Sequence, residues 1–191
     1  MSVQSDQSPD RSRAATPATA PAATPEPPGL SDRQPAVPAA RAASAGPYRT
    51  AVGLHLVLLD SGLVLLGRRR NSSFADGWWH LPAGHLESGE SVAEGMAREA
   101  REELGIGIDP AGLELLHVLH DLDEGENEGR LQLFFRTPAY TGRVENREPE
   151  KCHELRWWPL DGLPEPVVDY TARALREIAV GHRLSAAGWP A

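Results

Sequence analysis

The stretch of sequence that decides the fold is GHLESGESVAEGMAREAREELGI, residues 84–106. Its second half has the features of a helix with defined ends. Ser91 and Glu94 are spaced as a capping box, in which each side chain accepts a hydrogen bond from the other residue's backbone N–H. Gly105 stands where a helix can end in a left-handed conformation. The pattern predicts a helix that carries three glutamates close together: Glu99, Glu102 and Glu103.

The three carboxylates share one side of this helix. At about 100° per residue they span an arc of roughly 100°, which flanks the apolar face. A hard divalent cation such as Mg²⁺ or Mn²⁺ would convert their mutual repulsion into binding, because such ions prefer carboxylate oxygens. The helix alone is equally compatible with a solvated face that carries i,i+4 pairs, such as Arg98 with Glu102.

The residues around the helix decide between a metal site and a solvated face. From Gly84 onward the chain follows the spacing G-x5-E-x7-R-E-U-x-E-E-x-G-U, in which U is apolar, without a departure. This pattern resembles the signature of the Nudix hydrolases. The resemblance implies a loop-helix-loop that binds divalent metal, in an enzyme that hydrolyses a nucleoside diphosphate linked to a further group X.

Carried over residue by residue, the resemblance implies a metal site with Mg²⁺ or Mn²⁺ as the cofactor. The three glutamates match the catalytic, metal-binding positions, and the backbone carbonyl of Gly84 would complete the site. The expected metal ligands are Gly84, Glu99, Glu102 and Glu103. Glu90 and Arg98 match positions that brace the loop against the helix, so their expected role is structural.

Short β-rich runs surround the helix. Strands are predicted for residues 48–60, 63–70, 78–85, 112–123, 130–140 and 153–160. Ser61 and Gly62 predict a tight hairpin turn, and Pro82 is expected to end the third strand. A closing helix is predicted for residues 165–181, with Pro166 in its first turn. This order indicates an α+β fold in which helices sandwich a mixed β-sheet, an α/β/α sandwich.

The first 47 residues differ in composition from the rest. They are rich in proline and alanine and lack aromatic residues, so they cannot bury enough apolar surface to offset the entropy of ordering. The expected organisation is a disordered tail, residues 1–47, followed by a Nudix domain, residues 48–185.

Charge and cysteine content restrict the partners and the compartment. Acidic and basic residues balance in the tail, so the net charge of -8 belongs to residues 48–191. An acidic domain argues against non-specific binding to nucleic acid or to an anionic membrane. We expect a cytoplasmic protein, because no apolar run is long enough for a membrane span, no secretory signal is present, and the lone Cys152 fits a reducing compartment.

Similarity extends beyond the acidic helix. The segments LLGRRR, LPAGHLESGE and NREPEKCHELRWWPLDGLP are similar to the MutT-like nucleoside triphosphate diphosphatase branch of the family. Ala83 is one departure, because that branch usually has a second glycine there. The resemblance implies a small nucleotide substrate and is compatible with a homodimer.

Several residues outside the helix are candidate substrate contacts: Arg69, His85, Glu150, Trp157 and Trp158. Arg69 is expected to hold phosphate, on the sheet face opposite its two arginine neighbours, and His85 to touch phosphate. Glu150 is a candidate base or further ligand, with a charged loop residue as the alternative. One of the two tryptophans is expected near the nucleotide base and the other in the core. The strand histidines are expected to be ordinary strand residues: His80, His117 and His120.

Three functions stay open on the sequence. The first is a metal-dependent enzyme that converts a (deoxy)nucleoside triphosphate to nucleoside monophosphate and pyrophosphate, with nucleotide-pool sanitation as its role. The second takes X to be a sugar, as in ADP-ribose or a nucleotide sugar. The ADP-ribose branch usually has a proline about fifteen residues after the motif, and none lies between Pro110 and Pro138. The third is a Nudix-fold sensor that binds a nucleotide without cleaving it, and the intact acidic positions argue against it.

Overall fold

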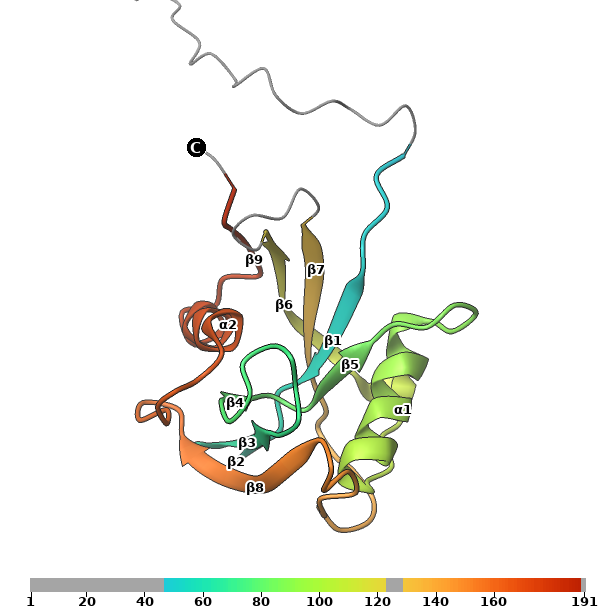
Figure 1. Cartoon of the computed structure of the whole chain (residues 1–191). Coiled ribbons are helices and arrows are strands. Elements are labelled where there is room, and N and C mark those ends of the chain that lie inside the picture. Colours follow the sequence, from blue (N-terminus) through green and yellow to red (C-terminus); the bar gives the residue numbers. More distant parts are fainter. Residues whose placement is uncertain (1–46, 123–128, 190–191) are drawn as a thin grey trace, which may run out of the picture. The chain divides into compact units, whose positions relative to one another are not determined.

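The computed structural model describes residues 47–122 and 129–189. The predicted disordered tail, residues 1–47, lies outside the described residues except for Pro47. Within the described part, the chain forms two α-helices, a short 3-10 helix and two β-sheets (Figure 1). In chain order the elements are β1 (Val52–Leu56), β2 (Leu59–Asp60), β3 (Leu63–Arg69), β4 (Trp79–His80), β5 (Ala83–His85), α1 (Val92–Leu104), η1 (Pro110–Gly112), β6 (Glu114–Asp121), β7 (Arg130–Arg136), β8 (Cys152–Pro159), α2 (Asp169–Ala179) and β9 (Leu184–Ala187).

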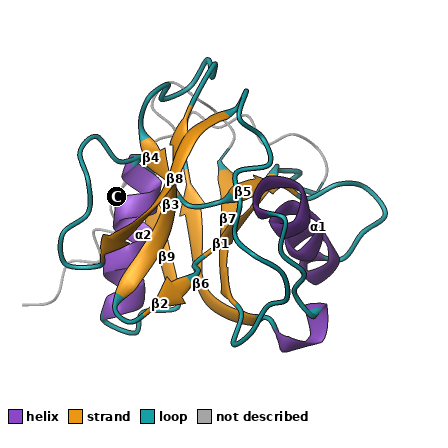
Figure 2. Cartoon of the chain, turned by 90° about the horizontal axis from the view of Figure 1, so that it is seen from below, coloured by secondary structure: helices purple, strands orange, loops and turns teal. Residues whose placement is uncertain are grey.

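The strands lie between the two helices (Figure 2). One sheet has the order β5-β1-β7-β6-β9, and in the other β3 pairs with β2, β4 and β8. Strand geometry sends successive side chains to opposite faces. On β7, Phe135 joins the core cluster under α1, whereas its neighbour Phe134 joins the cluster under α2. The predicted α+β class with helices on both sides is confirmed, although the expected single sheet is two sheets.

The first predicted strand is divided between these sheets. β1 pairs with β5 and β7, whereas β2 pairs with β3. The hairpin is therefore confirmed only for its inner part, where Leu59 pairs with Val64 around a turn at Ser61 and Gly62. Both turn residues have positive φ, 49° and 83°, as the right-handed twist of a two-residue hairpin requires.

The ends of α1 are those that the sequence predicts. The Ser91 side chain accepts a hydrogen bond from the Glu94 backbone, and the Glu94 carboxylate accepts one from the Ser91 backbone. Gly105 ends the helix in the left-handed conformation with φ 69°. Both ends of α1 are therefore held by capping hydrogen bonds, and these fix the way its acidic side faces.

The closing helix begins later than predicted. The prediction that Pro166 lies in its first turn is wrong, because α2 begins at Asp169. The backbone before the helix pairs with β4 instead: Trp79 donates a hydrogen bond to the Pro166 carbonyl, and Val168 donates one to the Trp79 carbonyl. These hydrogen bonds hold residues 166–168 extended.

Strand β9 has no counterpart in the sequence prediction and runs across the expected domain end at residue 185. It pairs in parallel with β6. The fully buried ring of His117 lies within hydrogen-bonding distance of the His182 carbonyl, 2.9 Å, and of the Ser185 hydroxyl, 2.8 Å. None of the described helices is both long and apolar enough to span a membrane.

Candidate active site

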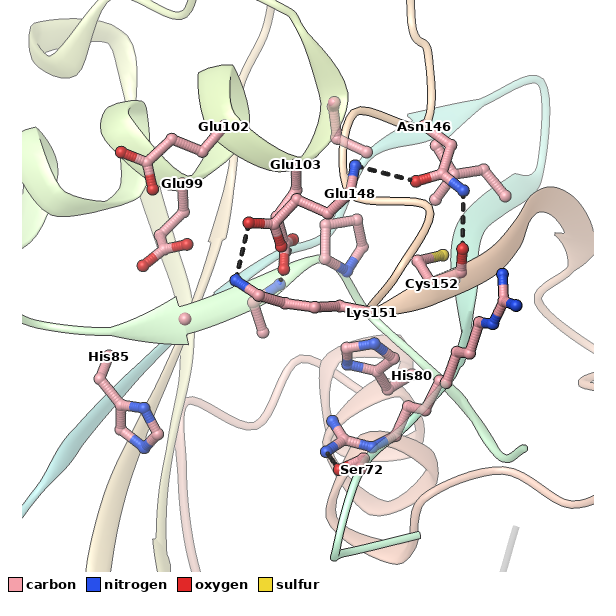
Figure 3. A pocket seen from close by; sticks show the side chains of 18 of the residues that line it. Ser72, His80, His85, Glu99, Glu102, Glu103, Asn146, Glu148, Lys151 and Cys152 are labelled. Atoms are coloured by element: carbon pink, nitrogen blue, oxygen red, sulfur yellow. Dashed lines mark hydrogen bonds and ion pairs between the residues drawn. The ribbon is translucent and has the colours of Figure 1, made fainter. Parts of the chain in front are cut away.

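The acidic side of α1 faces a cavity of about 480 Å³. The cavity lies between α1, β5 and the loop that precedes β8, and Figure 3 shows its side chains. Every ligand expected from the sequence lines it: Gly84, Glu99, Glu102 and Glu103. The fold therefore brings the acidic residues of one helix together with a glycine from a neighbouring strand.

Arg98 connects the loop before α1 to the acidic cluster. It donates two hydrogen bonds to the carboxylate of Glu90, at 2.8 and 3.1 Å, and one to the backbone carbonyl of His85. It also contacts Glu99 at 2.8 Å and Glu102 at 3.2 Å. The hydrogen bond from Arg98 lowers the pKa of Glu90. The predicted bracing pair is thus in contact, and the i,i+4 pair with Glu102 is present beside it.

Glu99 is the buried one of the three glutamates, Glu103 is half-buried and Glu102 is exposed. It accepts a hydrogen bond from the Ala83 backbone N–H at 2.9 Å. Burial and the charge of Glu99 raise the pKa of Glu103 to about 8, and burial also raises the pKa of Glu99. For neither carboxylate is the nearby positive charge enough to offset the effect of burial on its pKa. Ala83 lies in β5 without a positive φ, so the glycine usual at this position is not required.

Gly84 allows Glu99 to lie directly over the strand. A Cβ atom built at Gly84 would overlap all three carboxyl atoms of Glu99. Only glycine leaves room for the Glu99 carboxylate in this position. The two expected metal ligands, Gly84 and Glu99, are therefore adjacent.

The loop before β8, from which the sequence suggested Glu150, adds a different acidic residue to the cluster. Its backbone is attached to the end of α1, because Arg147 N–H donates to the Glu103 carbonyl and Glu145 N–H donates to the Leu104 carbonyl. This attachment brings Glu148 and Lys151 to the cavity (Figure 3), where the two side chains form an ion pair at 2.7 Å.

Glu150 is not the acid that this loop contributes. Its exposed side chain lies outside the residues that line the cavity, and its backbone carbonyl accepts a hydrogen bond from Asn71. The turn that holds Glu148 inward leaves Glu150 outward, two residues later. No spacing in the sequence distinguishes the two glutamates.

The remaining candidate contacts divide into two groups. Arg69 and His85 line the cavity. Trp157 packs against the cluster under α1 and Trp158 against the cluster under α2, and neither lines this cavity. The two tryptophans do lie on opposite faces of β8. Both faces pack against core clusters, so the expected contact with the base is assigned to neither tryptophan.

The donors beside Gly84 suit a hard divalent cation. In the described part of the chain, no three His, Cys, Asp or Glu side chains already converge closely enough to enclose a metal. Mg²⁺ retains several waters and needs only one or two carboxylates from the protein. Glu99 is buried and Glu103 half-buried, and both have raised pKa values. Such a cation would stabilise the ionised form of both carboxylates.

Comparison with known proteins decides the family. The NUDIX domain profile matches residues 47–178, which is most of the chain. The chain belongs to the Nudix family. The family predicted from the sequence is therefore confirmed, and residues 84–106 are its Nudix box.

Several characterised relatives share this domain. The chain is 32% identical over 160 residues to the NAD-capped RNA hydrolase NudC of Stutzerimonas stutzeri, across 76% of this chain and 53% of NudC. It is 30% identical over 148 residues to the RNA pyrophosphohydrolase of Novosphingobium aromaticivorans, across 69% of this chain and 90% of that protein. It is 28% identical over 110 residues to the human 8-oxo-dGDP phosphatase NUDT18, across 58% of this chain and 32% of NUDT18. The chain thus spans about half the length of NudC and about a third of NUDT18.

A solved structure gives the same result. The MutT NUDIX hydrolase from Burkholderia pseudomallei superposes with a TM-score of 0.61 and 30% sequence identity, across 67% of this chain and 97% of that one. The likeness covers nearly the whole of that smaller Nudix protein.

A buried histidine, His55, and a half-buried one, His80, lie beside the Nudix box. His80 lines the cavity, and burial lowers its pKa to about 3, with Arg69 adding to the effect. His55 on β1 lies within hydrogen-bonding distance of the Gln132 side chain at 2.9 Å, and burial lowers its pKa to about 4. Both rings are uncharged at neutral pH. The sequence prediction assigned no site role to either, because a histidine in an apolar strand carries no signal of a nearby cavity.

Burial of His55 predicts an acid-dependent stability. The pKa of His55 in the folded protein lies below its unfolded value of 6.5, so protonation of His55 favours the unfolded chain. The stability that depends on a neutral His55 is therefore fully present above pH 6.5 and is lost as pH falls toward 4. We expect this group to lower the free energy of unfolding by roughly 2 kcal/mol between pH 7 and pH 5. Urea denaturation at both pH values measures it.

A His55→Asn variant should show a correspondingly smaller pH dependence, whereas His153→Asn, at an exposed position, should match the parent. Equal slopes for the parent and His55→Asn would contradict the prediction.

Proposed function

We propose that this protein is a hydrolase that uses Mg²⁺ or Mn²⁺ to cleave a (deoxy)nucleoside triphosphate to nucleoside monophosphate and pyrophosphate. The observation that supports it most is the composition of one cavity. Three glutamates of a complete Nudix box, Glu99, Glu102 and Glu103, line this cavity together with the cations Arg69 and Lys151. A metal and a polyphosphate can therefore both be held there.

Each residue has a role that follows from its position. Glu103, Glu99 and the Gly84 carbonyl would hold the cation, with Glu102 acting through water. When bound, the cation would neutralise phosphate charge and lower the pKa of the attacking water. Arg98 keeps Glu99 oriented through their contact at 2.8 Å. Arg69, His85 and Lys151 would bind phosphate oxygens, as fixed positive groups and donors do in phosphoryl transfer.

The relatives support a second candidate of a related kind. The NudC and RNA pyrophosphohydrolase relatives are named for action on RNA, whereas NUDT18 is named for 8-oxo-dGDP. A diphosphate attached to the 5′ end of RNA presents the same bond to the same metal site. The net charge of -8 opposes long contacts with an RNA backbone, which favours the small nucleotide.

One assay separates the candidates. The purified full chain is incubated with and without Mg²⁺ against canonical and modified nucleoside di- and triphosphates, ADP-ribose, nucleotide sugars and RNA with triphosphate or NAD at its 5′ end. We expect metal-dependent release of nucleoside monophosphate and pyrophosphate from a nucleoside triphosphate. Cleavage confined to ADP-ribose, a nucleotide sugar or RNA would overturn the proposed substrate. Binding without turnover across the panel would indicate a sensor.

Glu148 gives a prediction with a matched control two residues away. Glu148 lies in the cavity beside Lys151, whereas Glu150 lies outside it. We expect Glu148→Gln to lower kcat/KM at least about tenfold, a loss of about 1.4 kcal/mol of transition-state stabilisation. Glu150→Gln should change it less than about twofold, in keeping with an exposed surface substitution. Equal effects of the two substitutions on kcat/KM would show that Glu148 has no special role.

A further inference from the structure

We propose that β8 pairs with the β8 of a second copy of this chain, in antiparallel orientation and centred on Leu155. The proposal goes beyond the proposed function, because it concerns how two chains associate and not how either chain holds metal or phosphate. The sequence resemblance is compatible with a homodimer but specifies no surface for it. The free edge of β8 specifies both the surface and the register.

β8 is an edge strand. Within residues 47–122 and 129–189 its ladder partner is β3 alone, and Figure 1 shows it as the outermost strand of its sheet, below β3. β3 pairs in turn with β2 and β4. None of the eight residues of β8 is buried. An exposed edge of this length presents a row of backbone N–H and C=O groups to which another strand can add.

The hydrogen bonds around β3 fix which backbone groups of β8 face outward. The Leu65 N–H donates to the carbonyl of the residue before β2, on the side of β3 away from β8. Leu65 lies opposite Trp157, and opposite residues of an antiparallel pair alternate between hydrogen-bonded and non-hydrogen-bonded. Trp157 and Leu155 therefore direct their N–H and C=O groups to the free edge. The Leu160 N–H donates back to the Gly62 carbonyl, as this alternation requires.

Two side chains of opposite charge lie on one face of β8, on either side of its centre. Arg156 lies over the Trp158 ring, with the guanidinium carbon 4.5 Å from the ring centroid. Glu154 contacts Arg68 at 3.9 Å. Arg68 and Leu66 share one face of β3, because they are two residues apart, and Leu66 lies opposite Arg156. Glu154 and Arg156 are both exposed, and a long ion pair at the surface holds Glu154 only weakly.

Charge selects one register for two antiparallel β8 strands. With Leu155 opposite Leu155 of the second copy, Glu154 of each copy lies opposite Arg156 of the other. These are then non-hydrogen-bonded positions, where cross-strand side chains approach most closely. Moving the centre by one residue places Glu154 opposite Glu154, or Arg156 opposite Arg156, and like charges directly opposite each other are destabilising.

The resulting pair is closed. A two-fold axis at Leu155 relates the copies, and each copy uses its β8 edge once, so no further chain can add there. The charges that favour this register oppose the neighbouring ones, and they thereby limit edge-to-edge aggregation. One strand from each copy makes a small interface, so we expect a weak dimer whose population depends on protein concentration.

Sedimentation velocity of the full chain, from about 5 to about 500 µM, measures the association. We expect a reversible equilibrium between monomer and dimer. Glu154→Arg and Arg156→Glu, each alone, should raise the dissociation constant at least about tenfold, because each sets like charges opposite each other in both cross-strand pairs. Glu165→Arg and Arg143→Glu make the same charge changes at exposed positions outside β8. They should alter the dissociation constant less than about twofold, since remote surface charges are screened.

Restored complementarity separates charge pairing from damage to the fold. An equimolar mixture of Glu154→Arg and Arg156→Glu should form a heterodimer, because each variant then presents the charge that the other lacks. The double variant should return to within about threefold of the parent dissociation constant. Thermal unfolding checks that every variant is folded. Turnover should stay within about twofold of the parent in all of them, so the dimer and the proposed hydrolase stand or fall separately.

Amide hydrogen exchange locates the contact. The N–H groups of Leu155 and Trp157 should exchange more slowly at a concentration that populates the dimer than at a low one, because pairing satisfies them. A monomer at every concentration would overturn the proposal, and so would single variants that dimerise as the parent does. A mixture of the single variants that stays monomeric would reject the register. Unchanged exchange at Leu155 and Trp157 in a dimeric sample would place the dimer on another surface and reject the β8 edge.

Discussion

Glu103→Gln is expected to abolish nearly all Mg²⁺-dependent turnover while the protein stays folded. The substitution removes a carboxylate that would hold the metal, which should cost several kcal/mol of transition-state stabilisation and leave less than about a tenth of the parent rate. The fold should tolerate it, because the pKa of Glu103 is raised to about 8 and the neutral acid already predominates at pH 7 without metal. Glutamine keeps an oxygen for the Ala83 N–H that now binds the carboxylate.

Steady-state kinetics with thermal unfolding in EDTA check this result. Glu154→Gln is the control, since Glu154 is an exposed strand residue outside the cavity beside the Nudix box, and it should retain the parent rate. A Glu103→Gln protein that hydrolyses at more than about a tenth of the parent rate would refute the assigned role. A large drop in its melting temperature would instead assign Glu103 a structural role.

Gly84→Ala is expected to be nearly as damaging through a single added methyl group. Its Cβ would occupy the space of the Glu99 carboxylate, which must then move away from the strand and from its contact with Arg98. We expect kcat to fall at least about tenfold, because a misplaced ligand costs transition-state stabilisation. The free energy of unfolding should fall by about 1–3 kcal/mol, as for other overpacked sites.

Gly112→Ala is the matched control for this steric effect. The nearest atoms to a Cβ at Gly112 lie 4.0 Å away, so activity and stability should both stay close to the parent. The steric explanation fails if Gly84→Ala keeps more than half of the parent kcat, as measured at saturating substrate and Mg²⁺.

The features predictable from the sequence are those with a local cause. The ends of α1 follow from Ser91, Glu94 and Gly105, whose effects act within a turn of the chain. The side of α1 that carries the acids follows from helical geometry. The pairing of Arg98 with Glu90 could be anticipated because the Nudix pattern fixes both positions in one short segment.

The features that escaped prediction depend on distant parts of the chain. Glu148 rather than Glu150 reaches the cavity because hydrogen bonds to the end of α1 set the course of its loop. β1 and β2 separate because they pair with different strands. A second cavity, of about 340 Å³, is lined by residues of β1, β7 and α2, and no periodicity within one element reveals that these three elements lie together.

The hydrogen bonds that join the loop before β8 to the end of α1 come from main-chain atoms, the N–H groups of Arg147 and Glu145. Backbone hydrogen bonds do not depend on the side chains of the residues that donate them. Positions 145 and 147, both exposed, can therefore accept almost any residue except proline, and the electrostatic potential around the cavity can be retuned by substitution without moving Glu148. A one-residue insertion between 147 and 148 would instead shift the register of the loop and remove that carboxylate from the site.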